Sequence, residues 1–313
     1  MTAVKWRPVI VFVLLAYALA WLCALPLWLG DGLREPLFPL YAVLMMATPA
    51  VAALATSRFV DRPPSIPREL GLVQFRPVGR FVLFLAAGWA LPVLLALAAL
   101  AVGALLGVYP ADFVDFSGYR LLLAQQSQAV GLAVPDLPIG VLVAAQFINV
   151  ALAAVINAIP ALGEELGWRG WLLPRLMPLG APAAVVVSGV VWGVWHAPLI
   201  LLGYNYPDGP GWLGVLAMCG MCTAFGGVFG WLRLRSGSVW PAALAHGALN
   251  ASAGLMFLFV AAGGRFSTLH ASVLGWSGWI VPLLLVAGLI AAGQFRPAAS
   301  HTVAAAYPPA GKP

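Results

Sequence analysis

Apolar runs of about 20 residues recur along this chain from one end to the other. A helix of about 20 residues, rising roughly 1.5 Å per residue, crosses the roughly 30 Å hydrocarbon core of a bilayer. Of the 313 residues, 62% are hydrophobic and 8% are charged, whereas a typical soluble domain has about a quarter charged residues. The sequence therefore predicts an all-α, polytopic membrane protein.

The hydropathy pattern predicts eight transmembrane helices, which we expect to form a single domain over residues 1–294. Residues 295–313 are rich in Pro, Ala and Gly, and we expect them to be a disordered cytoplasmic tail. Residues 121–130, between the third and fourth spans, are predicted to form a short interfacial helix. The eight predicted spans are residues 9–29, 37–59, 81–108, 139–162, 183–203, 212–232, 239–260 and 271–293.

The basic residues are distributed unevenly between the two sides that eight spans define. Thirteen Lys and Arg fall on the side of the two termini and three on the other side, namely Arg34, Arg120 and Arg265. By the positive-inside rule, both termini are then cytoplasmic. The formal net charge of +6 is a cytoplasmic excess that faces anionic lipid, so it implies no nucleic-acid partner.

The basic residues also bear on the source of the chain. Fourteen are Arg and two are Lys, and Ala and Gly are abundant. This usage is typical of a GC-rich bacterial gene. We therefore expect a multi-pass protein of a bacterial plasma membrane, with membrane lipid as its main partner.

Few polar side chains fall inside the predicted spans. An ionisable group in the hydrocarbon region costs about 2.5 to 3.5 kcal/mol on insertion scales, so each is a functional candidate. The candidates lie in three segments, distant from one another in sequence, and they are Glu164, Glu165, Arg169, His196, His246 and Asn250.

The first segment contains Glu164, Glu165 and Arg169 at the end of the fourth span. Glu165 and Arg169 are four residues apart, so on a helix they can pair on one face, while Glu164 points about 100° away and is left free. The alternative is an ordinary salt bridge at the water interface. Trp168 and Trp171 are expected to form a cytoplasmic interfacial belt, which would place Glu164 roughly 6 to 10 Å inside that boundary at about 1.5 Å per residue.

The second and third segments supply histidines. Trp192 lies one helical turn before His196 and should share its face; on its own, His196 would be a hydrogen-bonded packing residue. His246 and Asn250 are also four apart, and the residues around them are mostly Ala and Gly, which leave room for a cavity. Their alternative role is a hydrogen bond between helices.

Together these residues are the inventory needed to activate water, and two routes are open. In one, His196, His246 and Glu164 hold a zinc ion with an open position for water. In the other, Glu164 is the general base, one histidine assists proton transfer, and Asn250 with the other histidine donates to the oxyanion. In either case the cavity is expected to face the cytoplasm.

The three motifs, in this order and spacing, resemble those of the CPBP intramembrane proteases, a family that includes the type II CAAX prenyl endopeptidases. The resemblance covers residues 139–253. Glu164, Glu165 and Arg169 match the first motif, Trp192 and His196 the second, although the family more often has Phe at the Trp192 position, and His246 and Asn250 the third.

The resemblance implies a protease that cleaves a membrane-associated protein or peptide. It makes Glu164, His196, His246 and Asn250 catalytic, with Zn²⁺ as one option for the cofactor, and makes Glu165, Arg169 and Trp192 supporting residues. Two alternatives remain. One is a proton- or ion-coupled transporter that uses the same groups, and the other is a catalytically silent member that acts in bacteriocin immunity or as a scaffold.

Overall fold

The computed structural model describes residues 3–131 and 137–296. Within these residues the chain is helical, and its only β pairing is an isolated bridge between Ala111 and Val260. The prediction of an all-α fold is therefore confirmed. The expected tail lies almost wholly outside the described residues; of its members, Phe295 is described and packs in the core with 2% of its surface exposed.

Five helical segments of the described chain are long and apolar enough to cross a membrane. They are α1 (Trp6–Leu29), α2 with a π-helical extension (Phe38–Asp61), α4 (Val78–Leu105), α6 with the segments that follow it (Ile139–Leu179), and α10 (Gly211–Ser236). The other three predicted spans correspond to shorter helices: α8 (Ala181–Trp195), α11 (Trp240–Ser252) and α13 (Trp276–Ala291). The count of eight full spans is thus not confirmed.

The shorter helices end where the backbone is interrupted. α8 stops just before Pro198, and the chain then makes the single turn α9 (Ala197–Ile200). α11 is followed by a turn at Gly254 and by the short α12 (Leu255–Leu258). Proline lacks the N–H group that would continue the hydrogen bonds of α8, and glycine weakens a helix, so both residues shorten these segments.

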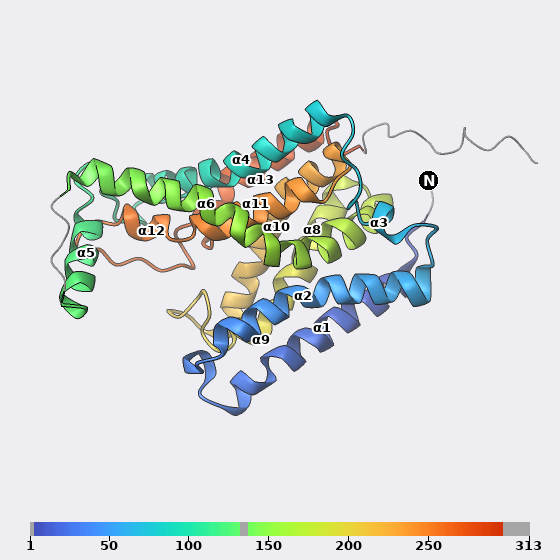
Figure 1. Cartoon of the computed structure of the whole chain (residues 1–313), viewed down its shortest axis with the longest axis horizontal. Helices are drawn as coiled ribbons and strands as arrows, with labels where there is room; N and C mark the ends of the chain where they lie inside the picture. Colours follow the sequence, from blue (N-terminus) through green and yellow to red (C-terminus); the bar gives the residue numbers. More distant parts are fainter. Residues whose placement is uncertain (1–2, 132–136, 297–313) are drawn as a thin grey trace, which may run out of the picture.

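The helix predicted between the third and fourth spans is present as α5 (Ser117–Ala129). It begins four residues before the predicted start, because the Asp112 side chain accepts hydrogen bonds from backbone N–H groups at and just before its first residue. The Asp112 carboxylate accepts hydrogen bonds from the backbone N–H groups of Val114, Asp115 and Ser117 at 2.8–3.2 Å. Figure 1 shows α5 at the far end of the molecule from the N-terminus, at a steep angle to α6.

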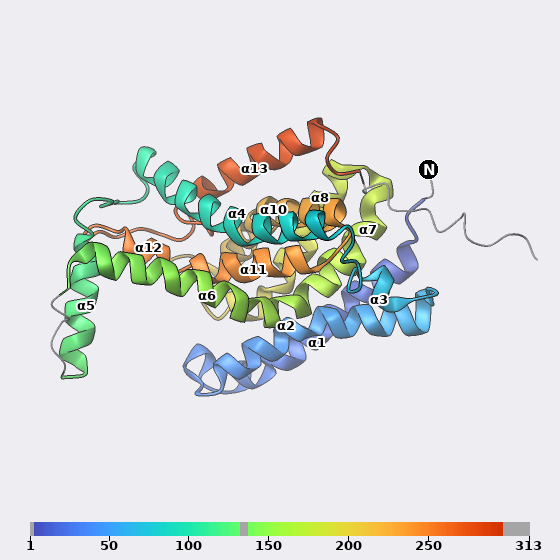
Figure 2. The ribbon, with the colours of Figure 1, turned by 45° about the horizontal axis from the view of Figure 1, so that its top comes forward.

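The helices α10 and α11 form the middle of the bundle. α11 packs against α6 and α4, and α10 packs against α8 and α13. Figure 1 shows α4 and α13 on one side of this pair and α1 and α2 on the other, and Figure 2 shows α13 and the α1–α2 pair again on opposite sides. Glycines permit the closest approaches: a Cβ on Gly247 of α11 would meet the Ala154 carbonyl oxygen and the Ala158 nitrogen of α6. Small residues at helix contacts are typical of membrane bundles.

Candidate active site

The first motif lies where α6 changes its winding. Glu164 and Glu165 are the last two residues of α6, and the π-helical segment η3 (Leu166–Leu172) carries the chain on to Arg169. π-Helical turns within α-helices are frequent at functional sites. Glu164 is 2% exposed, and Glu165 and Arg169 are fully buried.

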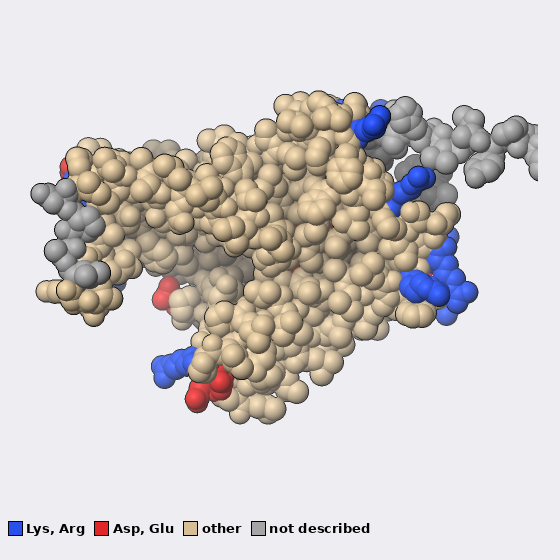
Figure 3. Space-filling view, in the orientation of Figure 1, with Lys and Arg blue, Asp and Glu red and all other residues tan. Residues whose placement is uncertain are grey.

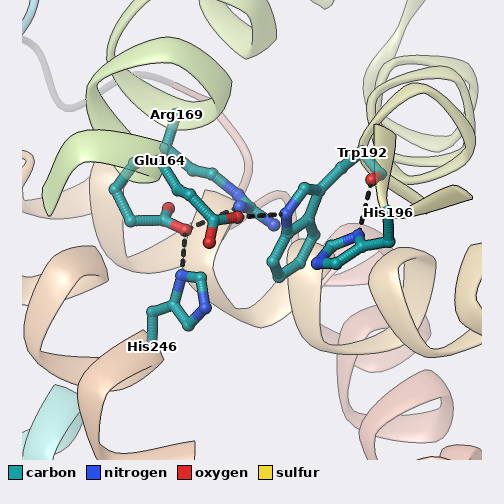
Figure 4. Close-up of polar contacts among 6 residues, drawn as sticks. Glu164, Arg169, Trp192, His196 and His246 are labelled. Atoms are coloured by element: carbon teal, nitrogen blue, oxygen red, sulfur yellow. Dashed lines mark hydrogen bonds and ion pairs between the residues drawn. The ribbon is translucent and has the colours of Figure 1, made fainter. Parts of the chain in front are cut away.

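Glu165 forms the pair predicted from its spacing with Arg169. Its Oε1 accepts from Arg169 Nη1 at 2.7 Å and also from His246 Nδ1 at 2.9 Å. One carboxylate oxygen therefore links α6 to α11 (Figure 4). A charged pair needs such further hydrogen bonds to offset its loss of hydration.

Burial excludes the alternative of a salt bridge at the water interface. Trp168 and Trp171 are fully buried, so the expectation that they form an interfacial belt is wrong. The π-helical segment turns both indoles inward, where Phe12 of α1 stacks on Trp171 with ring centroids 4.6 Å apart. Tryptophans beside an apolar helix end can thus be core residues as well as interface residues.

Glu164 is held by a different partner. Its Oε2 accepts a hydrogen bond of 2.7 Å from the indole Nε1 of Trp192 on α8. Figure 4 shows the Glu164 carboxylate facing the Trp192 indole, with His246 nearby. An indole N–H can only donate, so this contact fixes the carboxylate without delivering a proton to it.

Arg169 is enclosed by aromatic rings. Its guanidinium carbon lies 4.0 Å from the centroid of the Trp192 ring and 5.2 Å from that of Phe229 on α10. A Cβ on Gly226 would come within 2.7 Å of Arg169 Nη2. Cation–π contacts strengthen where water is absent, so the rings hold the part of the guanidinium that Glu165 does not.

Phe229 is a site residue that sequence reasoning missed. Its ring stacks on the imidazole of His246, with centroids 5.7 Å apart and planes at 23°. It thereby joins Arg169 and His246, which come from α6's extension and α11. The one available signal was Gly226, three residues earlier, which marks the closely packed face of α10.

His196 lies at the end of α8, next to Trp192 as predicted. Its Nδ1 is 2.9 Å from the carbonyl oxygen of Trp192. Because a carbonyl can only accept, Nδ1 carries the proton, and Nε2 keeps a free lone pair when the ring is neutral. The same argument applies to His246, whose Nδ1 faces the Glu165 carboxylate.

These side chains surround one cavity of about 270 Å³. Glu164, Trp192, His196, His246 and Asn250 all line it. Glu165 and Arg169 are buried and do not line it; they contact His246 and Trp192, which do. The three segments therefore meet, as the sequence predicts.

The remaining wall of the cavity is apolar and rich in methionine. Five of the seven methionines in the sequence line it, on α2, α10 and α12. They are Met45, Met46, Met218, Met221 and Met256. Methionine side chains are unbranched and adapt to ligands of different shape, so the wall fits apolar groups that differ in form.

The residues predicted to hold zinc do not form a complete ligand set. Within residues 3–131 and 137–296, no three His, Cys, Asp or Glu side chains are grouped so that they could bind a metal ion. The hydrogen bonds at Nδ1 of His246 and His196 leave Nε2 of both rings free, so it is the spacing of the side chains, and not their hydrogen bonds, that leaves the set incomplete. A structural or catalytic zinc site needs at least three protein ligands, so the described residues do not provide a complete zinc site.

Residues 144–252 match the model of a protein family described as type II CAAX prenyl endopeptidase, Rce1-like. The matched range contains all seven predicted site residues. No curated protein matches the sequence. The family match confirms the resemblance seen in the three motifs and supports a protease over the transporter alternative.

Proposed function

We propose, from the membership of residues 144–252 in the Rce1-like type II CAAX prenyl endopeptidase family, that this protein hydrolyses a peptide bond of a membrane-associated protein inside the bilayer. The observation that carries the proposal is that Glu164, His196, His246 and Asn250 line one cavity within a bundle of apolar helices. A carboxylate, two imidazoles and an amide together can activate water and stabilise the charge that forms on the substrate.

Glu164 is the general base in this proposal. The Trp192 indole holds its Oε2, and the carboxylate takes a proton from a water molecule in the cavity. The water oxygen then forms a bond to the carbonyl carbon of the substrate. When the carbon–nitrogen bond breaks, Glu164 returns the proton to the leaving amine, so that water is the only reagent consumed.

His246 and Asn250 stabilise the oxyanion of the tetrahedral intermediate. Glu165 Oε1, 2.9 Å away, accepts from His246 Nδ1, so a His246 ring that carries a second proton donates it from Nε2 toward the cavity. Asn250, one turn further along α11, supplies an amide N–H on the same side of the helix. Donors held in place in a site without bulk water are worth about 100- to 1000-fold in rate each.

His196 orients the attacking water. The Trp192 carbonyl fixes its Nδ1–H, so that Nε2 is an acceptor for one of the water's two protons. Glu164 accepts the other. Two acceptors on one water set the direction of its lone pair, which is a form of positioning that raises the rate without proton transfer to His196.

The proposal is tested by the appearance of new protein termini in membranes. We expect wild-type cells to contain N- and C-termini that are absent from cells with Glu164→Gln, a variant that keeps the size of the side chain and its bond from Trp192. Glu69→Gln, at an exposed carboxylate, is the matched control and should leave all termini unchanged. Identical termini in the wild type and in Glu164→Gln would contradict the proposal.

A separate measurement decides between the glutamate and the zinc routes. The proposed route predicts that purified protein cleaves its substrate at the same rate before and after dialysis against a chelator. Loss of cleavage on chelation, with recovery on adding Zn²⁺, would instead establish the zinc route. Metal content measured on the same samples links the two results.

A further inference from the structure

The cavity is closed at one end of the molecule and open at the other. The helices that line it do so near one common end: Met45 lies near the start of α2, Met218 near the start of α10, Trp195 at the end of α8 and Asn250 near the end of α11. α6 is the exception, because it reaches the cavity with Glu164, its penultimate residue. Glu164 therefore lies at the floor.

The mouth is formed by two connections on the open end. Tyr204 and Asn205 come from the connection between α9 and α10, and Ser272 and Leu274 from the connection that precedes α13. Tyr204 is 36% exposed. Figure 3 shows the surface hollowed on the side away from the N-terminus, between the α5–α6 end and the α1–α2 end.

The opposite end is sealed by aromatic side chains. Trp168 and Trp171, just beyond Glu164 in the chain, are fully buried. Phe12 packs against both, with ring centroids 5.5 Å from Trp168 and 4.6 Å from Trp171. Leu70, from the connection between α2 and α4, is also buried, and its backbone lies against Gly170, between the two tryptophans in the chain.

Charge distinguishes the two ends. The sealed end carries the greater part of the described basic side chains, and Figure 3 shows them gathered there. They are Lys5, Arg7, Arg58, Arg62, Arg68, Arg76, Arg80, Arg175, Arg233, Arg235 and Arg296. The open end has three, Arg34, Arg120 and Arg265, beside the acidic Asp31, Glu35, Asp112, Asp115 and Asp208.

We infer that the substrate reaches the cavity from the extracytoplasmic face of the membrane. Basic residues near the ends of membrane helices stay on the cytoplasmic side, so the sealed end is cytoplasmic and the mouth between Tyr204 and Ser272 faces outward. The occupant is an apolar segment of an exported or membrane-anchored protein. The inference rests on the proposed function for the identity of its ligand, and it replaces the expectation of a cytoplasm-facing cavity.

Thiol labelling tests the direction of access independently of activity. In a chain with Cys23, Cys219 and Cys222 replaced by Ala, single cysteines are placed at three positions. Ala253→Cys lies in the cavity wall, Asp208→Cys in the exposed connection at the mouth, and Arg68→Cys is exposed at the sealed end. Each variant is treated with a membrane-impermeant maleimide in spheroplasts and in inverted membrane vesicles.

We expect Asp208→Cys and Ala253→Cys to be labelled in spheroplasts and to lose that labelling in inverted vesicles, and Arg68→Cys to show the reverse. Labelling of Ala253→Cys together with Arg68→Cys would overturn the inference, and so would labelling of Ala253→Cys from neither face while the denatured protein reacts. If the triple Cys→Ala chain does not fold, the same cysteines are added to the natural chain and compared with it. Failure of the proposed function would appear instead as unchanged protein termini, with the labelling pattern intact.

Discussion

At the scale of the residue, one buried carboxylate organises the site. Glu165 accepts from Arg169 and from His246 through a single oxygen, and its other oxygen has no hydrogen-bond partner among the described residues. Arg169 in turn depends on Trp192 and Phe229 for the contacts that water would otherwise make. Removing any one of these side chains leaves another buried polar group without a partner.

Arg169→Met is expected to destabilise the protein by about 3–5 kcal/mol, because it leaves the Glu165 carboxylate buried without its cation. The measurement is thermal unfolding in detergent. Arg68→Met, at an exposed arginine, is the control and should have a melting temperature close to that of the wild type. Equal melting temperatures for the two variants would show that the Arg169–Glu165 pair contributes nothing.

Phe229→Leu is expected to lower kcat by about tenfold or more with little change in KM, because misplacing a catalytic group by about 1 Å can cost roughly 100-fold in rate. The change removes the ring that stacks on His246 and covers Arg169. Phe225→Leu is the matched control, since Phe225 is equally buried one turn earlier on α10. An equal loss of kcat in both variants would mean that Phe229 acts only through packing.

Among the helices, α11 and α5 are held in place in different ways. The position of α11 depends on close packing against α6, and the start of α5 depends on local hydrogen bonds. α11 carries His246 and α6 carries Glu165, so the 2.9 Å contact between them needs the two backbones to approach closely. Gly247 is the residue that allows this approach. α5, by contrast, is built by local contacts with Asp112.

Gly247→Ala is expected to destabilise the bundle by about 1–3 kcal/mol, the usual cost of overpacking, and to reduce cleavage further because His246 moves with its neighbour. Backbone atoms of Ala154 and Ala158 occupy the space that the new Cβ needs. Gly288→Ala on α13, where nothing lies within 4 Å, is the control. It should unfold at the same or a slightly higher temperature, because Ala favours a helix over Gly.

The hydrogen bonds of the Asp112 carboxylate make the stability of the start of α5 depend on pH, but only at strongly acidic pH. The pKa of the Asp112 carboxyl lies well below its ordinary value. The largest cause is the hydrogen bond from the Ser117 side chain, followed by those from the Ser117 and Asp115 backbones. A lowered pKa gives stability that is present above the unfolded pKa of about 3.9 and is lost only as pH falls through the folded value. Hydrogen exchange at the Ser117 amide should therefore stay protected down to pH values near 4 in the wild type. Asp112→Ala should lose that protection at every pH, and equal protection in the two proteins would contradict the role of the carboxylate.

At the scale of the whole molecule, the uneven charge and the position of the cavity are independent features, and both are needed to say from which side a substrate arrives. Charge determines which end of the bundle stays in the cytoplasm. Packing determines at which end the helices diverge around Asn250 and Tyr204 and at which end Trp168 and Trp171 close the bundle.

Reporter fusions test the charge argument alone. We expect a fluorescent protein fused after Pro313 to fluoresce, as it does when folded in the cytoplasm, and alkaline phosphatase inserted after Asp208 to be active, as it is outside. Inserting the phosphatase after Arg68 is the control and should give an inactive enzyme. An active phosphatase after Arg68 and an inactive one after Asp208 would mean that the protein has the opposite orientation in the membrane. The shape of the cavity would be unaffected by that result.

Local geometry explains what could be predicted from the sequence alone. The membrane class follows from apolar runs, because their length must match the bilayer. The Glu165–Arg169 pair and the placement of His246 and Asn250 on one face follow from 3.6 residues per turn, which no packing changes. Three rare polar segments in a fixed order were also enough to predict the family whose model matches residues 144–252.

Only the tertiary structure determined which atoms meet between helices. The Trp192 bond to Glu164, the stacking of Phe229 on His246 and the burial of Trp168 all depend on helix tilt and rotation. These are set by glycine contacts such as Gly247 against α6, which hydropathy does not register. The end at which the cavity opens depends on the tertiary structure for the same reason: depth along one helix is a local quantity, whereas access depends on how all the helices converge.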